Sequence, residues 1–173
     1  FKRFPKIFNT FSKIERAKRI RMYKKNLSER FKGLMDKKLL MDRSKSKVFF
    51  RKKNHFNFNL KSKKKKILIQ AHQLNDAVHV YGKNLFNDFY ELLEFLGKLS
   101  EKTNYLWLLK PHPSEAEVNL NYLKEYVKKY KNIQLLNGNI SNSELIKEKI
   151  SCVTTVYGSA GHEFPLFNIP VVN

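Results

Sequence analysis

The sequence predicts an α/β fold, in which helices cover both faces of a parallel sheet, preceded by a basic and largely helical segment. From Lys66 onward, short apolar runs alternate with longer amphipathic runs, and strands separated by helices form parallel sheets with right-handed crossovers. The charge is divided at the same place. Residues 1–66 hold 25 Lys and Arg against 4 Asp and Glu, whereas residues 67–173 hold 10 against 11. We therefore expect residues 1–65 to be a helical or linker segment from an upstream domain and residues 66–173 to be the α/β domain.

The basic segment mixes Lys and Arg with aromatic residues. Its middle part has apolar residues at helical spacing, which predicts one or two basic amphipathic helices: Ile14, Ala17, Ile20, Tyr23, Leu27, Phe31 and Leu34. Three interpretations are open, in this order: outer helices of an upstream domain, attraction to an anionic membrane surface, and nucleic-acid binding by phosphate neutralisation and aromatic stacking. Because no RNA-binding fingerprint or zinc spacing supports the third, we do not expect nucleic acid as a partner.

Strands and helices are expected to alternate along residues 66–173. The expected strands are Lys66–Ala71, Asn104–Leu109, Ile133–Leu136, Cys152–Tyr157 and Val171–Val172. The expected helices are Leu85–Leu99, Glu115–Tyr130, Asn142–Lys149 and Ala160–Phe167, and the N-caps of the last three are expected to be Ser114, Ser141 and Ser159.

Cysteine content and hydropathy bear on where the protein works. The only cysteine, Cys152, lies in a predicted buried strand and cannot form an internal disulfide, which agrees with a reducing compartment. No apolar run reaches the roughly 18–20 residues of a membrane span. The chain begins at Phe1 rather than at Met and ends as a strand begins, so we expect a fragment of a longer protein. The expected location is the cytoplasm, either free or peripheral at the inner face of the cell membrane.

Polar residues follow the predicted strands at the points where the strands end. His72 and Asp76 follow the first strand, Lys110 and His112 follow the second, and the turn Gly158–Gly161 follows the fourth. The carboxyl ends of parallel strands meet at one edge of the sheet, and open α/β sheets bind their ligands there. This convergence predicts a binding cleft.

The most specific short motif is Lys110-Pro111-His112-Pro113. Two prolines fix the backbone around a histidine, and Lys110 places a positive charge beside it. Such a site suits a phosphate or pyrophosphate, or a proton transfer by His112. The alternative is a rigid strand-to-helix turn whose histidine only bonds backbone groups. We favour a functional role, because a turn needs neither the lysine nor the histidine.

The small residues after the fourth strand suit an anion. A turn with Gly158 and Gly161 lets a ligand approach the backbone, and a helix that begins after Ser159 offers unpaired N–H groups to negative charge. Glu163, on the first turn of that helix, suits two ribose hydroxyl groups, or it stabilises the helix dipole, and the two roles are compatible. His72 and Asp76 suit an acid/base pair or sugar-hydroxyl contacts, and a plain surface pair is the alternative. No spacing predicts a metal site.

Three blocks of the sequence, in this order, resemble a known family. They are AHQLNDAVHVYGKNLFNDFYELLEFL, LLKPHP and TVYGSAGHEFPLFNIPVVN. They look like bacterial capsule or surface-polysaccharide biosynthesis proteins and are more distantly similar to capsule Kdo transferases and to the CDP-glycerol glycerophosphotransferases of teichoic acid synthesis. The resemblance covers Lys66 to Asn173. It implies a GT-B architecture, with two Rossmann-like domains and the active site between them, of which this chain would carry most of the C-terminal, nucleotide-binding domain.

The resemblance also implies roles for single residues. The expected catalytic residues are His112 and Lys110, which would contact the donor phosphates, and His72, which would lie near the interdomain cleft. The glycine/serine turn would hold phosphate and Glu163 would face the donor ribose. His162 stands where related families often carry a different residue. The expected donor-binding residues are therefore Gly158, Ser159, Gly161, Glu163, His162 and Asp76.

We accordingly expect a metal-independent glycosyltransferase of capsular polysaccharide biosynthesis without a cofactor. Its partners would be a nucleotide-sugar, as the donor substrate, and a growing polysaccharide or lipid-linked acceptor, with an anionic membrane surface as a further partner of residues 1–66. Two alternatives on the same fold are a polyol-phosphate transferase and a nucleotide-sugar 2-epimerase, which fold analogy does not separate from it. A non-enzymatic basic module that binds membrane or nucleic acid is the alternative from another class.

Overall fold

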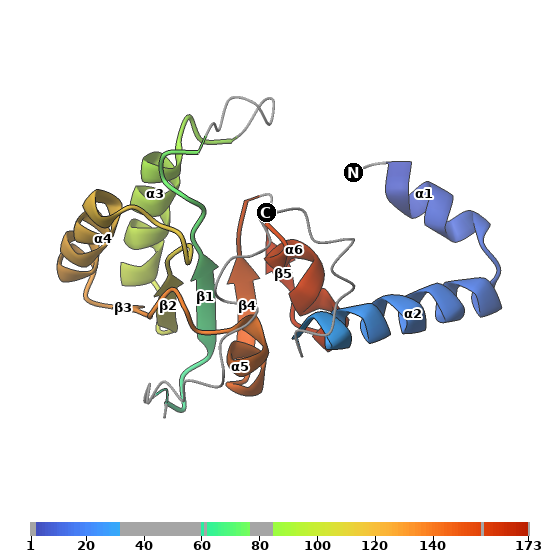
Figure 1. Ribbon diagram of the computed structural model, residues 1–173. Helices are drawn as coiled ribbons and strands as arrows, with labels where there is room; N and C mark the ends of the chain where they lie inside the picture. Colours follow the sequence, from blue (N-terminus) through green and yellow to red (C-terminus); the bar gives the residue numbers. More distant parts are fainter. Residues whose placement is uncertain (1–2, 32–59, 61, 77–84, 157, 173) are drawn as a thin grey trace. The chain divides into compact units, whose positions relative to one another are not determined.

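The computed structural model describes residues 3–31, 60, 62–76, 85–156 and 158–172 (Figure 1). The chain divides into two compact units, Phe1–Phe50 and Arg51–Asn173, and each is described by itself. Within the described residues, none of the helices has both the length and the apolar character that crossing a membrane requires.

The first unit contains helices α1 (Arg3–Thr10) and α2 (Lys13–Phe31). Helix α2 begins with a reciprocal cap, because Ser12 Oγ accepts from the Glu15 backbone N–H and the Glu15 carboxylate accepts from the Ser12 backbone N–H. This confirms a helix in the basic segment. The large apolar side chains of Ile14, Met22 and Tyr23 are exposed, and at 3.6 residues per turn they lie on different sides of the helix. Leu34 falls outside the described residues.

The second unit contains a parallel sheet of five strands in the order β3-β2-β1-β4-β5. The strands are β1 (Lys66–Gln70), β2 (Leu106–Lys110), β3 (Ile133–Leu135), β4 (Ile150–Thr154) and β5 (Val171–Val172). The helices are α3 (Phe89–Glu101), α4 (Glu117–Lys129), α5 (Asn142–Lys147) and α6 (Ala160–Glu163), the last continued by the 3-10 helix η3 (Phe164–Phe167). This arrangement confirms the predicted α/β fold, a Rossmann-like parallel sheet with helices on both faces.

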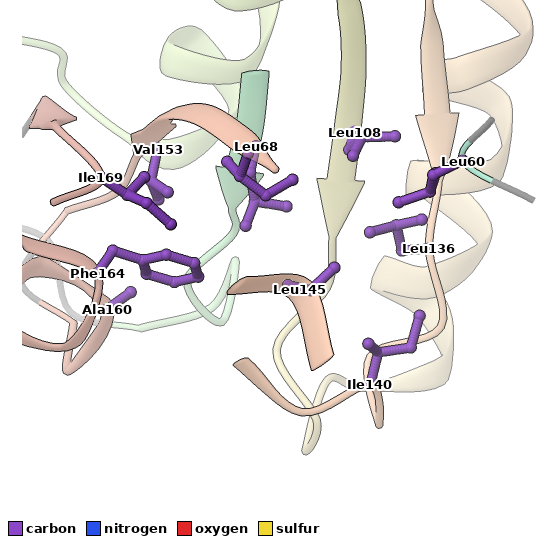
Figure 2. Packing of buried hydrophobic residues seen from close by; sticks show 11 residues of the cluster. Leu60, Leu68, Leu108, Leu136, Ile140, Leu145, Val153, Ala160, Phe164 and Ile169 are labelled. Carbon is purple, nitrogen blue, oxygen red and sulfur yellow. The ribbon is translucent and has the colours of Figure 1, made fainter. Parts of the chain in front are cut away.

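Each face of the sheet is covered by different helices, as Figure 1 shows. Helices α3 and α4 pack on the face that carries Ile69, Trp107 and Leu109. Helices α5, α6 and η3 pack on the face that carries Leu68 and Leu108, where Figure 2 shows the buried side chains. Because successive strand residues point to opposite faces, each short apolar strand contributes to both cores.

The helix starts confirm one predicted cap in this unit and correct one. Ser141 caps α5 through a capping box with Glu144, as expected, and α5 ends at Lys147 shortly before Lys149, which has a positive φ of 56°. Helix α4 begins at Glu117 rather than after Ser114, so the predicted cap at Ser114 is wrong. The N–H groups of Ser114 and Glu115 are bonded to His112, which makes a turn of the residues that were expected to be helical.

Candidate functional site at the carboxyl edge of the sheet

The predicted site residues follow strands β1, β2 and β4, which are neighbours in the sheet. The chain builds β2 and β3 on one side of β1 and then returns to place β4 and β5 on the other side, so the strand order reverses between β1 and β4. In open α/β sheets, ligands bind beyond the carboxyl ends of the strands at such a reversal. The fold thus gathers the segments after Gln70, Lys110 and Thr154 at one edge.

One face of the sheet changes from apolar to polar at this edge. Leu68 pairs in register with Leu108, and both side chains are fully buried. Two residues further along, Gln70 pairs in register with Lys110. Since every second residue of a strand faces the same side, Gln70 and Lys110 lie next to the leucines on the face that α5, α6 and η3 cover.

Lys110 carries a buried amino group at the end of β2. The residue is only 5% exposed, and no hydrogen bond to its ammonium is found among the residues that the structure describes. Burial disfavours the charged form and lowers the pKa of Lys110 to about 8, while the Glu163 carboxylate opposes this shift. A largely buried lysine side chain is costly for a fold, so its position at the carboxyl edge of the sheet suits an anionic ligand.

Glu163 accepts a hydrogen bond from the amide of Asn142, which is itself held by the amide of Gln70. The carboxylate is buried, with an exposed fraction of 3%. Asn142 donates from Nδ2 to Glu163 Oε2 at 2.6 Å, and Gln70 donates from Nε2 to Asn142 Oδ1 at 2.7 Å. The three side chains come from β1, α5 and α6, so this chain of hydrogen bonds links three elements at the carboxyl edge.

His112 is half-buried in the turn after β2, and its imidazole has a defined tautomer. Its Nδ1 accepts a hydrogen bond from the Ser114 backbone N–H at 3.1 Å, so the neutral ring carries its proton on Nε2. Burial lowers the pKa of His112, and the nearby charges of His72 and Lys110 act in the same direction, against Glu115 and Asp76. His112 therefore works as a neutral hydrogen-bond donor, and the backbone contact considered as its alternative role is also formed.

His72 and Asp76 form the predicted pair in the segment after β1. His72 Nδ1 lies 3.1 Å from Asp76 Oδ2, and the imidazole ring stacks on Phe89 with 5.1 Å between the ring centroids. The stack on Phe89 restricts the orientation of the ring. Because the charge of His72 acts on His112, the structure brings the first and second predicted segments of the site together.

The turn after β4 differs from the prediction. Helix α6 begins directly after Ser159, as predicted, but it has only four residues, Ser159 has helical backbone angles, and the Ser159 side chain makes no capping bond. The N–H of Gly161 bonds to the Gly158 carbonyl, and the N–H groups of His162 and Glu163 both bond to the Ser159 carbonyl. These three donors are thus used within the turn, which leaves the short helix a poor anion site.

His162 and Glu163 are neighbours in the sequence with opposite environments. His162 is exposed, whereas Glu163 contacts Asn142 and lies close enough to Lys110 for its charge to act on the lysine. The two residues were grouped as donor-binding residues. The structure separates them, because the single turn of α6 directs one side chain to solvent and the other to the interior.

Gln70 and Asn142 are site residues that the sequence did not predict. Gln70 ends a strand that was expected to be apolar core, and Asn142 follows a serine that was expected only to cap a helix. The alternation of β1 was the available signal, since Gln70 follows Leu68 at a spacing of two and so shares its face. Within the described part of the chain, no cluster of three or more His, Cys, Asp and Glu residues is placed to hold a metal ion. Cys152 is half-buried, and burial raises the pKa of its thiol.

Comparison of the chain with protein-family models, with curated proteins and with solved structures found no match in any of the three. The resemblance to capsule biosynthesis proteins therefore stays a prediction from the three sequence blocks, and the chemistry of the carboxyl edge supplies the further argument.

Proposed function

We propose that the second unit binds a nucleotide-activated sugar through its phosphates and that the protein is a glycosyltransferase of surface (capsular) polysaccharide biosynthesis. The observation that carries this proposal is Lys110, a buried cation without a hydrogen-bond acceptor among the described residues, at the edge where the strand order reverses. The acceptor would be a growing glycan or a lipid-linked glycan, and residues 1–66, with their excess of Lys and Arg, would hold the enzyme near an anionic membrane surface.

The proposed chemistry is stabilisation of a leaving group. As the bond between sugar and nucleotide breaks, negative charge grows on the departing phosphate or diphosphate. The Lys110 ammonium would offset this charge, and the His112 Nε2–H would donate a hydrogen bond to it. Both groups are held in place before the ligand arrives, since strand β2 fixes Lys110 and the Ser114 N–H fixes the tautomer of His112. His72, beside Asp76, adds a polar group on the same side of the site.

The first experiment is a thermal-shift screen of the full chain with CMP, CDP, UDP, GDP and CMP-sugars. A nucleotide present at about 100 times its dissociation constant stabilises the folded state by about 2.7 kcal/mol, which is a readable shift for a unit of this size. We expect one nucleotide class to stabilise the protein and Lys110→Met and His112→Ala to lose that shift. Product analysis with that donor then distinguishes sugar transfer from polyol-phosphate transfer and from 2-epimerisation.

The matched control is Lys66→Met. Lys66 is also a buried lysine on the face covered by α5, but it lies at the amino end of β1, where its Nζ donates to the Glu148 carbonyl at 2.8 Å. The control removes a buried charge at the opposite edge, so nucleotide stabilisation should persist in Lys66→Met. No shift with any nucleotide, together with salt-sensitive binding to anionic vesicles or RNA, would reject the proposal in favour of the non-enzymatic basic module.

A further inference from the structure

We propose that Glu163 is a positioning residue: its buried carboxylate, held by Asn142, which Gln70 holds in turn, serves as the counter-charge of Lys110 at the carboxyl edge of the sheet, where an anionic ligand would bind. This inference rests on the proposed function for the identity of the ligand. It gives Glu163 a different task from the ribose contact that the sequence resemblance implies, and it assigns tasks to two residues that the sequence did not single out.

The geometry of Glu163 supports an inward role. A ligand hydroxyl group needs a carboxylate that it can reach, whereas Glu163 is 3% exposed and one of its oxygens accepts from Asn142 at 2.6 Å. Burying a carboxylate costs free energy unless hydrogen bonds or a positive charge compensate it. The amide of Asn142 supplies the hydrogen bond and Lys110 supplies the positive charge.

The electrostatic relation between the two residues gives Glu163 its task. Burial alone drives Lys110 toward the neutral amine, which does not attract phosphate, and the Glu163 carboxylate acts in the opposite direction. Lys110 ends β2, two residues before His112, and the other groups whose charges act on His112 are His72, Asp76 and Glu115. His72 is an imidazole that stacks on Phe89, and Glu115 accepts from the Asn119 amide. Glu163 is thus the carboxylate that acts on Lys110 from the opposite side, on α6.

Asn142 and Gln70 determine where the Glu163 carboxylate lies. Asn142 is the first residue of α5, directly after the capping box of Ser141 and Glu144, so the start of α5 fixes its position. Gln70 ends β1 beside Lys110 and orients the Asn142 amide at 2.7 Å. A strand and a capped helix thereby hold the Glu163 carboxylate in place through the two amides.

The experiment is a pH titration of Lys110 by NMR of the full chain carrying ¹³C-labelled lysine, with the Lys110 signal assigned from Lys110→Arg. We expect a midpoint near pH 8 in the native chain. Glu163→Gln should move this midpoint to lower pH, because the opposing charge is lost while the shape is kept. Asn142→Ala should move it in the same direction by less. Pyrophosphate binding, measured by calorimetry, should lose its affinity at a correspondingly lower pH in Glu163→Gln.

Two controls separate this effect from a general loss of structure. Glu94→Gln removes a partly buried carboxylate that accepts from Lys129 and Tyr130 on the other face of the sheet, and it should leave the Lys110 midpoint unchanged. The control for Asn142→Ala is Asn132→Ala, which removes an amide that donates to the Ser100 carbonyl at the other end of the unit. Asn132→Ala should also leave the Lys110 midpoint unchanged. An unchanged midpoint in Glu163→Gln, or a native Lys110 that titrates at its ordinary pKa of 10.5, overturns the inference.

The same measurements keep this inference apart from the proposed function. If Glu163→Gln shifts the Lys110 midpoint but no nucleotide stabilises the chain, the counter-charge is supported and the glycosyltransferase proposal fails. If a nucleotide binds through Lys110 but the Lys110 midpoint is unchanged in Glu163→Gln, the proposed function is supported and the positioning role is overturned.

Discussion

The two faces of one sheet perform different tasks in this protein. On the face that α3 and α4 cover, the strands present Ile69, Trp107 and Leu109, which are all at most 3% exposed. Two tyrosine hydroxyls there find partners inside the protein: the Tyr126 hydroxyl donates to the Leu93 carbonyl at 2.6 Å and the Tyr130 hydroxyl donates to Glu94 at 2.7 Å. This face is packed against α3 and α4.

The face that α5, α6 and η3 cover starts in the same way and ends differently. Leu68 and Leu108 are fully buried, and the next pair on this face is Gln70 and Lys110. The Lys110 ammonium has no hydrogen-bond acceptor in the described part of the chain. Leu108 and Lys110 are both buried and lie two positions apart on the same face of β2. The leucine stabilises the fold, whereas the buried lysine costs stability and suits a ligand.

The largest expected effect tests the two faces with consecutive residues. Leu108→Ala and Leu109→Ala each remove a fully buried leucine and should lower the free energy of unfolding by about 2–5 kcal/mol, measured by urea denaturation. Only Leu108→Ala should also weaken nucleotide binding, because Leu108 lies next to Lys110 on the same face and its loss lets the lysine side chain relax into the cavity. Equal loss of nucleotide binding in the two variants would contradict the expectation that only the face covered by α5, α6 and η3 affects binding.

The second effect is the stability cost of Lys110 and its pH dependence. A pKa of about 8 in the folded state, against 10.5 for an unperturbed lysine, means that the protonated group destabilises the fold by about 3 kcal/mol below pH 8. Between pH 8 and 10.5 the folded chain releases this proton while the unfolded chain keeps it, so the cost disappears as the pH rises. The stability of the native chain relative to Lys110→Met should therefore increase by about 2–3 kcal/mol from pH 7 to pH 10.5 in urea unfolding experiments. A constant difference would mean that Lys110 is charged at an ordinary pKa.

The smallest effect compares one glycine from each face. A Cβ at Gly97 on α3 would lie 2.4 Å from Cε2 of Tyr130, a ring that is 2% exposed and is held by Tyr126 and Glu94. Gly97→Ala should cost about 1–3 kcal/mol in thermal or urea unfolding, and the added substitution Tyr130→Leu should recover part of that loss.

Gly158→Ala is the matching variant at the site. A Cβ there would meet Thr155 Oγ1 at 3.2 Å, a contact that needs only a small adjustment, so it should unfold with nearly native stability. If Gly158→Ala lowered the free energy of unfolding as much as Gly97→Ala, the expected difference between the two glycines would be wrong.

Much of the fold was predictable from the sequence. The five strands lie within a few residues of their expected positions, because short runs such as residues 106–109 are apolar on both faces. Ser141 acts as the expected cap because its partner Glu144 stands at the required spacing in the sequence. An apolar run and the spacing of a capping box each involve only a few neighbouring residues, so both can be recognised in the sequence.

The candidate site was predictable only in part. The bond between Gln70 and Asn142 joins residues 72 positions apart, and no local pattern contains it. Ser114 was expected to cap α4, but its N–H is bonded to the His112 ring. The burial of Glu163 likewise follows from how α6 packs against the sheet rather than from its own turn. Tertiary packing therefore decided which of the polar residues turn toward Lys110.

The strand order also has a consequence for how the chain is made. Strand β1 lies in the centre of the sheet between β2 and β4, and Lys66 of β1 pairs with Ile150 of β4. Because β4 follows β2 and β3 in the sequence, this second neighbour of β1 is synthesised last of the three. Until β4 leaves the ribosome, one edge of β1 is unpaired and carries the apolar residues Leu68 and Ile69. Such an edge can pair with a strand of another nascent chain. Translation that pauses between β3 and β4 prolongs this vulnerable stage, and chaperone demand should peak there. Glu163 emerges later still, so the hydrogen bonds that link it to Asn142 and Gln70 form only as the last part of the sheet closes.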